Sequence, residues 1–146
     1  MPAVTKNRMI ELFWRVHPVV YRLTGGRLLG RLDGVPVLLL VTRGRKSGAT
    51  RTKPLLYLAD GDSFVVAASY AGEPRHPAWW LNLRAHPNAQ VQVGSRVVDV
   101  RAREAEGEER ARLWRAIVAQ DASFAEYERR TTRRIPVVVL EPVHRA

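Results

Sequence analysis

The sequence predicts an α+β fold, in which peripheral helices surround a small antiparallel β-barrel. Short strand-like segments follow one another and are separated by turn residues typical of β-hairpins. One helix-like segment lies between two hairpins, and two more follow the last hairpin. The 146 residues, 46% of them hydrophobic, suit a single globular core. Because hairpin-linked strands are antiparallel, a doubly wound parallel sheet is not expected.

The first 34 residues are predicted to form an amphipathic helical segment that precedes a barrel domain of residues 35–146. Between Thr5 and Thr24, apolar side chains recur along one stripe, as in helices that bury one face. Pro18 is expected to kink or split this helix, because its ring clashes with the preceding turn. Arginines recur every seven residues on another stripe, at Arg8, Arg15 and Arg22.

The predicted barrel consists of six strands, two of whose turns carry strong hairpin signals. Asp60-Gly61-Asp62 and Gly94-Ser95 each contain a glycine, which adopts the positive φ of a tight turn without strain. The predicted strands are Pro36–Val41, Thr52–Ala59, Ser63–Ser69, Ala89–Val93, Arg96–Arg103 and Ile135–Leu140. Apolar residues at helical spacing predict helices at Arg75–Ala85, Glu106–Ala119 and Ser123–Arg130.

The chain carries a formal net charge of +10, which favours an anionic partner. Such a partner is a nucleic acid, an acidic membrane surface or a polyanionic small molecule. The absence of cysteine excludes disulfides and thiol chemistry, and the four histidines lack metal-ligand spacing, so no metal site is predicted. With no apolar run of membrane-spanning length and no recognisable signal peptide, we expect a cytoplasmic protein.

The most informative run is Thr42–Arg51, which lies between two predicted strands and contains little but glycine, small hydroxyl residues and cations. At a hairpin tip, these residues present backbone N–H groups, hydroxyl donors and positive charge to one spot. Such a spot suits a phosphate or a carboxylate, although a solvated basic turn has the same composition. The run is not a P-loop, because no helix pattern follows Lys46-Ser47.

A second group of residues joins a strand of small side chains to an aromatic-rich helix. Ala67–Gly72 ends the strand with a hydroxyl and a glycine, and Pro77–Leu83 begins the helix. Small residues allow a flat ring to lie against the backbone, whose N–H and C=O groups can read its polar edge. Trp79 and Trp80 either form the walls of such a pocket or pack in the core.

Several motifs occur in an order and spacing that extend from Val37 to Pro142. They are Thr42-x-Gly44-Arg45-Lys46-Ser47-Gly48, Arg51-x-x-Pro54-Leu55, Val66-Ala67-Ala68-Ser69, Pro77-x-Trp79-x-Leu81-Asn82-Leu83, Pro87-x-x-x-Val91-x-Val93, Ala102-Arg103, Glu108-Glu109-Arg110 and Arg134-Ile135-Pro136-Val137-Val138-Val139. In these motifs the chain resembles the deazaflavin-dependent nitroreductase family. That family consists of split β-barrel oxidoreductases, similar to FMN-binding barrels, that use coenzyme F420.

The resemblance implies that the basic tip binds coenzyme F420, which carries a phosphate and a tail of linked glutamates. The residues implied to hold the phosphate and the tail are Arg45, Lys46, Ser47 and Arg51. The deazaflavin ring would lie between the end of the small-residue strand and the start of the aromatic helix. The other implied cofactor-binding residues are Pro54, Ala67, Ala68, Ser69, Tyr70, Ala78, Trp79, Trp80 and Asn82.

The implied reaction is hydride transfer from the reduced deazaflavin to a quinone, a nitroaromatic or a similar conjugated acceptor. Ser69 is the candidate hydrogen-bond donor to the acceptor, and Tyr127 is the candidate proton donor or pocket wall. Leu56 and Phe124 complete the implied substrate pocket with Tyr127. Nitroimidazole-reducing members of the family have several tyrosines where this chain has Leu56, Asp121, Phe124 and Tyr127. This departure argues against nitro-drug reduction and leaves the acceptor open, with quinones such as menaquinone implied by the resemblance.

Other functions fit parts of the sequence. The same barrel could bind FMN, but FMN lacks a glutamate tail and leaves the cations of residues 45–51 unexplained. A non-enzymatic nucleic-acid-binding module suits the net charge but shows no recognised reader motif. A barrel that binds a ligand without turnover is a further alternative. The N-terminal helix suits peripheral contact with an anionic membrane, packing on its own barrel, or the seam of a homodimer, which is expected by analogy.

Overall fold

The computed structural model describes residues 16–22, 30–32 and 34–143 and has a mixed α+β architecture. The strands are β1 (Arg31–Leu32), β2 (Val35–Arg43), β3 (Thr50–Leu56), β4 (Leu58–Asp60), β5 (Ser63–Ala67), β6 (Asn88–Val93), β7 (Arg96–Glu104) and β8 (Val137–Pro142). The helices are α2 (Ala78–Ala85), α3 (Gly107–Gln120) and α4 (Ser123–Arg130), with a 3-10 turn η1 (Tyr70–Gly72) and a further helical stretch at residues 16–22.

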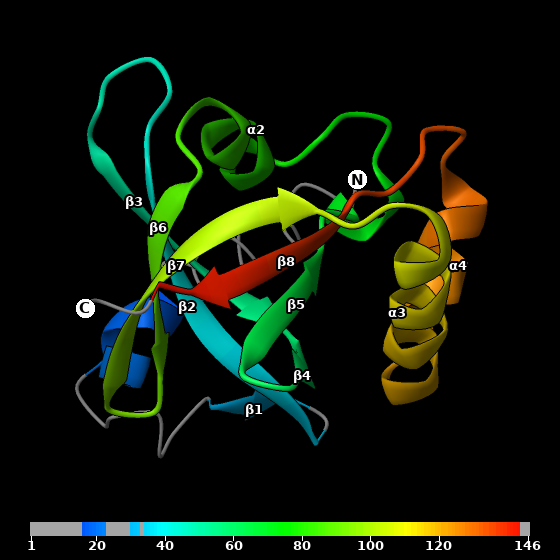
Figure 1. Cartoon of the computed structure of the whole chain (residues 1–146), viewed down its shortest axis with the longest axis horizontal. Helices are drawn as coiled ribbons and strands as arrows, with labels where there is room; N and C mark the ends of the chain where they lie inside the picture. Colours follow the sequence, from blue (N-terminus) through cyan, green and yellow to red (C-terminus); the bar gives the residue numbers. More distant parts are fainter. Residues whose placement is uncertain (1–15, 23–29, 33, 144–146) are drawn as a thin grey trace, which may run out of the picture.

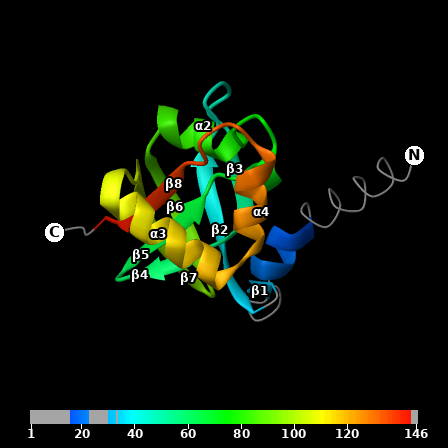
Figure 2. The same cartoon turned by 90° about the vertical axis from the view of Figure 1, so that its right-hand side faces the viewer.

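The strands form one eight-stranded sheet that curls into a half-barrel (Figure 1). Its order is β1-β2-β6-β7-β8-β5-β4, and β3 also pairs with β2. All the pairings are antiparallel. Figure 2 shows α3 and α4 side by side on the outside of the sheet. The predicted α+β antiparallel barrel with peripheral helices is therefore confirmed.

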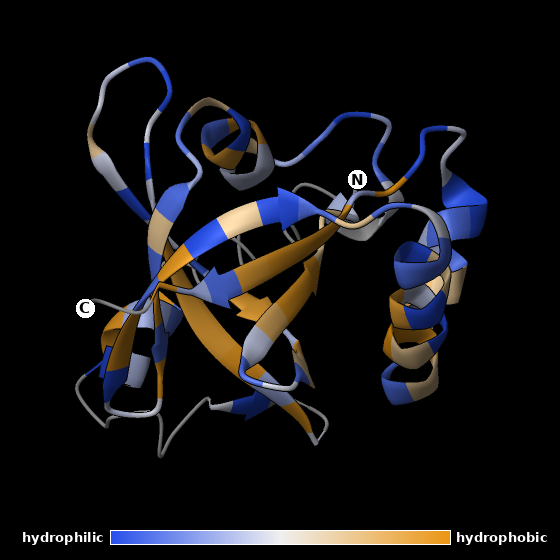
Figure 3. Cartoon of the chain, viewed as in Figure 1, coloured by the Kyte–Doolittle hydropathy of each residue, from blue (hydrophilic) through white to orange (hydrophobic). Residues whose placement is uncertain are grey.

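Both faces of the central strands are buried, which explains their continuous apolar runs. In β2, Leu38 and Leu40 belong to the cluster inside the barrel, whereas Val37 and Leu39 pack with Tyr21 on the outside. β5 and β8 alternate in the same way, with their outer residues packed against α3 and α4. Figure 3 shows hydrophobic residues along these strands and on the faces of α3 and α4.

Residues 16–22 are the described part of the predicted N-terminal helix, and Tyr21 fastens them to the barrel. Tyr21 is 1% exposed, and its hydroxyl donates to the Val37 carbonyl at 3.0 Å and accepts from the Gly94 N–H at 2.8 Å. His17 is buried and stacks on Tyr21, with the ring centroids 6.0 Å apart. This part of the segment packs on its own barrel, and the rest of the predicted helix lies outside the described residues.

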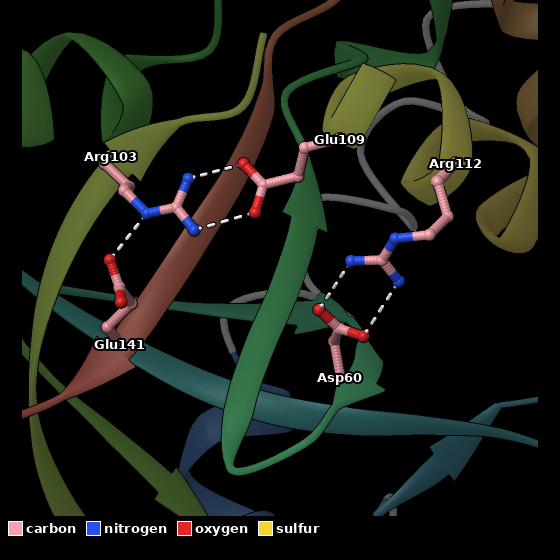
Figure 4. Close-up of polar contacts among 5 residues, drawn as sticks. All are labelled: Asp60, Arg103, Glu109, Arg112 and Glu141. Carbon is pink, nitrogen blue, oxygen red and sulfur yellow. Dashed lines mark hydrogen bonds and ion pairs between the residues drawn. The ribbon is translucent and has the colours of Figure 1, made fainter. Parts of the chain in front are cut away.

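Exposed ion pairs hold α3 to the sheet (Figure 4). Arg103 on β7 contacts both oxygens of Glu109 on α3, at 2.6 and 2.8 Å, and Glu141 on β8 at 2.6 Å. Arg112 on α3 contacts both oxygens of Asp60 on β4, at 3.1 and 3.2 Å. Hydrogen bonds from these guanidinium groups lower the pKa of Glu109 and the pKa of Asp60 below their usual values.

Two predicted strands differ from the observed ones. The predicted strand Thr52–Ala59 is two strands, because residues up to Leu56 pair with β2 and those from Leu58 pair with β5. The continuous apolar pattern hid this change of partner. The predicted strand Ser63–Ser69 ends at Ala67, because the chain then turns into η1.

Most of the remaining boundaries are shifted by one to three residues, while α4 has the predicted bounds. The predicted helix Arg75–Ala85 begins at Ala78, because Pro77 is extended (ψ 150°) and occupies the N-cap position. Proline also disfavours the helical conformation in the residue before it, which keeps His76 out of the helix. The predicted strand Ile135–Leu140 runs from Val137 to Pro142.

Candidate functional site

The predicted basic tip is the connection between β2 and β3, which rises from the sheet beside α2 (Figure 1). The side chains of Arg45, Lys46 and Arg51 are exposed. Gly48 closes the turn by donating its N–H to the Gly44 carbonyl at 2.8 Å, and its φ of +73° favours glycine. The structure therefore presents Arg45 and Lys46 on a short, hydrogen-bonded turn and Arg51 at the start of β3.

The side chain of Ser47 hydrogen-bonds to the backbone of this same turn. Its Oγ accepts the N–H of Ala49 at 3.1 Å, so its own hydrogen is left to donate to a ligand. A Cβ on Gly44 would lie 3.0 Å from this oxygen and 3.2 Å from the Ala49 carbonyl. Glycine at position 44 thus allows the serine to fold back under the turn.

Asn82 of α2 fixes the direction of the hairpin. Its side-chain oxygen accepts hydrogen bonds from the backbone N–H and the guanidinium of Arg45, both at 3.2 Å. Its amide nitrogen donates to Thr42 Oγ1 at 3.2 Å, and both Asn82 and Thr42 are buried. Asn82 is predicted to contact the cofactor ring, and in the structure its amide holds the base of the basic tip against α2.

An open hollow of about 670 Å³ lies at the base of the same hairpin. It is lined by Val41, Thr42, Arg43, Gly48, Thr50, Asn88, Ala89, Gln90, Asp99, Val100 and Val143. Among these residues, Arg43 contributes an exposed cation. None of the predicted ring-binding residues 67–70 lines this hollow, whereas Asn82 of the second predicted group donates to Thr42, one of its lining residues.

The aromatic pair of α2 lies in the core. Trp79 and Trp80 are 7% and 5% exposed and pack inside the barrel with Leu83. Of their predicted partners, Ala78 is exposed at the first turn of α2 and Pro54 is buried in β3. Most of each indole ring therefore packs in the core, which was one of the two predicted places for Trp79 and Trp80. Contact between these rings and a cofactor stays a prediction.

The small-residue group continues from β5 into an irregular segment of residues 68–76. Ala67 is half-buried at the end of β5, while Ala68 and Ser69 are buried. Tyr70 has φ +46°, an uncommon conformation for a residue with a side chain, and is 43% exposed. The Arg75 guanidinium lies 5.7 Å from the centroid of the Tyr70 ring. Strain of this kind persists only where the surroundings enforce it.

Arg133, which the sequence analysis did not select, enforces the shape of this segment. Its guanidinium donates to the carbonyl oxygens of Ala68 at 3.0 Å, Ser69 at 2.6 Å and Glu73 at 2.9 Å. It also lies 3.2 Å from Nδ1 of His76. Arg133 stands between α4 and β8 and is distant in sequence from all four acceptors, so spacing alone gave no signal.

The protonation state of His76 follows from this contact. A guanidinium only donates hydrogen bonds, so Nδ1 of His76 must accept, and the proton of the neutral ring lies on Nε2. Burial and the nearby Arg133 lower the pKa of His76 below its usual value. The histidine is therefore neutral at pH 7.

The predicted substrate-side residues meet against this segment. Leu56, Phe124 and Tyr127 belong to one hydrophobic cluster, which also includes Ala67. The rings of Phe124 and Tyr127 pack edge to face, with centroids 5.5 Å apart. A Cβ on Gly72 would lie 2.8 Å from the Tyr127 carbonyl, so α4 contacts η1 directly. The structure thus brings α4 against the segment that contains Ser69.

Comparison with a family model places the whole described barrel in a known group. Residues 13–142 match the model described as F420H(2)-dependent quinone reductase. A relative named F420H(2)-dependent quinone reductase Rv1261c, from Mycobacterium tuberculosis (strain ATCC 25618 / H37Rv), is 41% identical over 130 residues. The alignment covers 86% of this chain and 87% of that relative.

Two solved structures are also similar to this chain, and one of them has a description that names an F420-H2 dependent reductase. A structure described as F420-H2 dependent reductase (FDR-A) is 41% identical and superposes with a TM-score of 0.68, covering 73% of this chain and 94% of that one. A second, described as a domain-swapped dimer, is 34% identical with a TM-score of 0.71. It covers 97% of this chain and 100% of the other.

Proposed function

The chain belongs to the F420H(2)-dependent quinone reductase family, and from this premise we propose that it transfers a hydride from reduced coenzyme F420 to a quinone-like acceptor. The cofactor supplies the hydride, and one proton must be added for the quinone to become a hydroquinone. The protein binds both molecules, orients them and stabilises the charge that develops on the acceptor oxygen.

The family supports the predicted use of coenzyme F420 and the predicted oxidoreductase class. The description of this family refers to quinone reduction, and not to the nitroreduction that the resemblance in the sequence implied. Leu56, Asp121 and Phe124 stand where nitroimidazole-reducing relatives have tyrosines, and this difference also favours quinone reduction over nitroreduction. We therefore infer that quinones are the main acceptors and that nitroaromatics are poor ones.

The observation that carries the proposal is the fixed direction of the basic hairpin. Asn82 ties Arg45 to α2, so the three exposed cations of the tip stand on an anchored support. A phosphate and a chain of glutamates match this donor set, because each charge-assisted contact contributes roughly 1.5–3 kcal/mol. FMN has a phosphate but no carboxylate tail, and would leave part of this charge unused.

The second support is the contact between the segments that carry Ser69 and Tyr127, which approach each other at Gly72. Ala67 is half-buried at the end of β5 and has little side-chain bulk, which suits the approach of a flat ring to the backbone. In this arrangement the Ser69 hydroxyl donates a hydrogen bond to the acceptor oxygen, and the Tyr127 phenol supplies a proton or closes the pocket. Leu56 and Phe124 then provide the apolar wall for a quinone ring.

A cofactor titration followed by an acceptor panel tests the proposal. We expect F420 to bind tightly enough to be followed by its fluorescence, and reduced F420 to be oxidised by menadione faster than by a nitroimidazole. Tight retention of FMN without F420 binding would replace the assignment by the FMN alternative. F420 binding without oxidation by any acceptor would favour a barrel that binds without turnover.

Membrane contact and dimerisation are secondary proposals. Among the described helices, none is long and apolar enough to span a membrane. Peripheral contact would involve the basic N-terminal segment, and co-sedimentation with anionic vesicles tests it. One solved relative is described as a domain-swapped dimer, which supports a homodimer here. Light scattering of the purified full chain gives the mass directly.

A further inference from the structure

We propose that Arg133 is a positioning residue that sets the geometry between the Ser69 segment and α4. The inference rests on the proposed function, because its consequence is expressed in hydride transfer. Arg133 does not itself need to touch the cofactor or the acceptor. Its role is to hold the backbone on which Ser69 is presented, at a fixed place relative to Tyr127.

The contacts of the guanidinium are all directed to one segment. Nε donates to Glu73, Nη1 to Ala68, and Nη2 to Ser69, with donor–acceptor distances between 2.6 and 3.0 Å. Nη1 also contacts His76 Nδ1 at 3.2 Å. The planar guanidinium of Arg133 therefore contacts four acceptors that lie 57 to 65 residues earlier in the chain. Only arginine has donors in this arrangement.

The segment depends on this fork because its own backbone pairing is limited. Ala68 and Ser69 are buried, so their carbonyl oxygens need donors from the protein. The Ser69 carbonyl also accepts the Gly72 N–H at 2.9 Å, a bond within the turn itself. The uncommon φ of Tyr70 follows at once in the chain. A lysine at position 133 would contact one or two of these oxygens and leave the turn free to relax.

Arg133 also connects this turn to α4. Its backbone N–H donates to Thr131 Oγ1 at 3.3 Å, just after the C-terminus of α4. On the other side of the contact, Gly72 allows η1 to lie against the Tyr127 carbonyl. Arg133 thus contacts the segment of the candidate donor through its guanidinium and the end of the helix of the candidate phenol through its backbone N–H. Displacement by about 1 Å at such a site can lower a rate by about a hundredfold.

The test compares Arg133→Lys with Arg134→Lys, a neighbouring exposed arginine that retains its charge in the variant. For Arg133→Lys we expect kcat with menadione to fall about 10- to 100-fold, with the Kd for F420 changed by less than about threefold. For Arg134→Lys we expect both values within about twofold of the wild type. Circular dichroism at the assay temperature establishes that each variant is folded.

A second variant covers the case in which Arg133→Lys does not fold. His76→Ala removes one acceptor and leaves the three carbonyl contacts, so we expect a fold intact at the assay temperature and a fall in kcat of about two- to fivefold. Unchanged kcat in a folded Arg133→Lys, or in a folded His76→Ala where the first variant is unfolded, overturns the inference. Equal losses in the Arg133 and Arg134 variants also overturn it.

Failure of the proposed function gives a different result. If the wild-type protein neither binds F420 nor oxidises its reduced form, the premise is wrong. Hydrogen exchange then still reports the structural part of the inference, because faster exchange at residues 68–76 in Arg133→Lys but not in Arg134→Lys is expected irrespective of any ligand. Equal exchange in the two variants would refute that part.

Discussion

The basic hairpin and the Ser69 segment are built in opposite ways. The hairpin places its cations in solvent and is held to α2 through one amide, that of Asn82. The Ser69 segment begins with the buried residues Ala68 and Ser69 and is held by a guanidinium that contacts four acceptors. This difference supports the proposed division of labour, in which exposed charge would capture a ligand and a fixed backbone would orient it.

The largest expected effect concerns the binding of F420 by the cations of the basic hairpin. In the double variant Lys46→Ala/Arg51→Ala, we expect F420 affinity to fall by about 3 kcal/mol, or roughly a hundredfold, because two charge-assisted contacts are lost. Stability should change by less than about 1 kcal/mol, since exposed cations contribute little to folding. Fluorescence titration and thermal unfolding measure the two quantities.

A matched control removes two cations elsewhere. Arg96 and Arg115 are exposed on β7 and α3, and the variant Arg96→Ala/Arg115→Ala loses the same formal charge. We expect its F420 affinity to stay within about threefold of the wild type at physiological salt, where charges beyond the Debye length of about 8 Å are screened. Equal losses in the two double variants would mean that net charge, not the hairpin, captures the cofactor.

The second effect concerns the rigidity of the Ser69 segment. Gly72 has φ +80°, and an added Cβ would lie 2.7 Å from Arg130 Cβ and 2.8 Å from the Tyr127 carbonyl. We expect Gly72→Ala to lower the free energy of unfolding by about 2–3 kcal/mol, from backbone strain and displacement of α4. Urea denaturation measures this value.

Gly61 provides the control for that variant. It also has a positive φ, +60°, but a Cβ there would meet nothing within 4 Å. Gly61→Ala should therefore cost only the strain, about 1 kcal/mol. If both variants lose the same stability, the close approach of η1 and α4 is less important than the distances indicate.

The third effect concerns the hydroxyl of Ser69 and distinguishes orientation of the acceptor from binding of the cofactor. Ser69→Ala should lower kcat about tenfold, or about 1.4 kcal/mol, because a hydrogen bond to the developing charge is lost. The Kd for F420 should change little, since the tail contacts are elsewhere. Ser95→Ala, in the exposed β6–β7 turn, is the control and should leave both constants unchanged. A changed Kd with unchanged kcat would assign Ser69 to binding.

The smallest effect lies away from both regions, in the ion pairs of α3. The pKa of Glu109 is lowered in the folded state, so its stabilising contribution is present above its unfolded pKa of about 4.3 and is lost as pH falls through the folded value. We expect Glu109→Gln to lose about 0.5–1 kcal/mol at pH 7 and to match the wild type near pH 2–3. Urea unfolding at both pH values measures the difference, and a difference that persists at low pH would refute the assignment.

Local patterns predicted most of the fold. The Gly61 and Gly94 turns located two hairpins, and α4 has the predicted bounds, because turn chemistry and apolar spacing act over a few residues. The break at Tyr57 was missed, since Leu56 and Leu58 are both partly buried and differ only in which strand they pair with. Such a change of partner depends on the curl of the sheet, which no short window contains.

The candidate site was predictable where composition marks it and unpredictable where distant contacts make it. The cations around Lys46 and the small residues up to Ser69 are visible in the sequence. Arg133 is one arginine among many, and its role arises from acceptors more than 50 residues away. The amide of Asn82 was selected for the ring, but its bonds to Arg45 were not foreseen, because they require the hairpin to lean on α2.

The sequence separation of the Arg133 contacts also bears on folding. The basic hairpin turn closes through a bond between Gly48 and Gly44, which are neighbours in the chain. The Ser69 segment instead depends on Arg133, which lies 57 to 65 residues after its acceptors, and β8 after it joins β5 to β7. Contacts between such distant residues require a larger loss of chain entropy before they form than a local turn does.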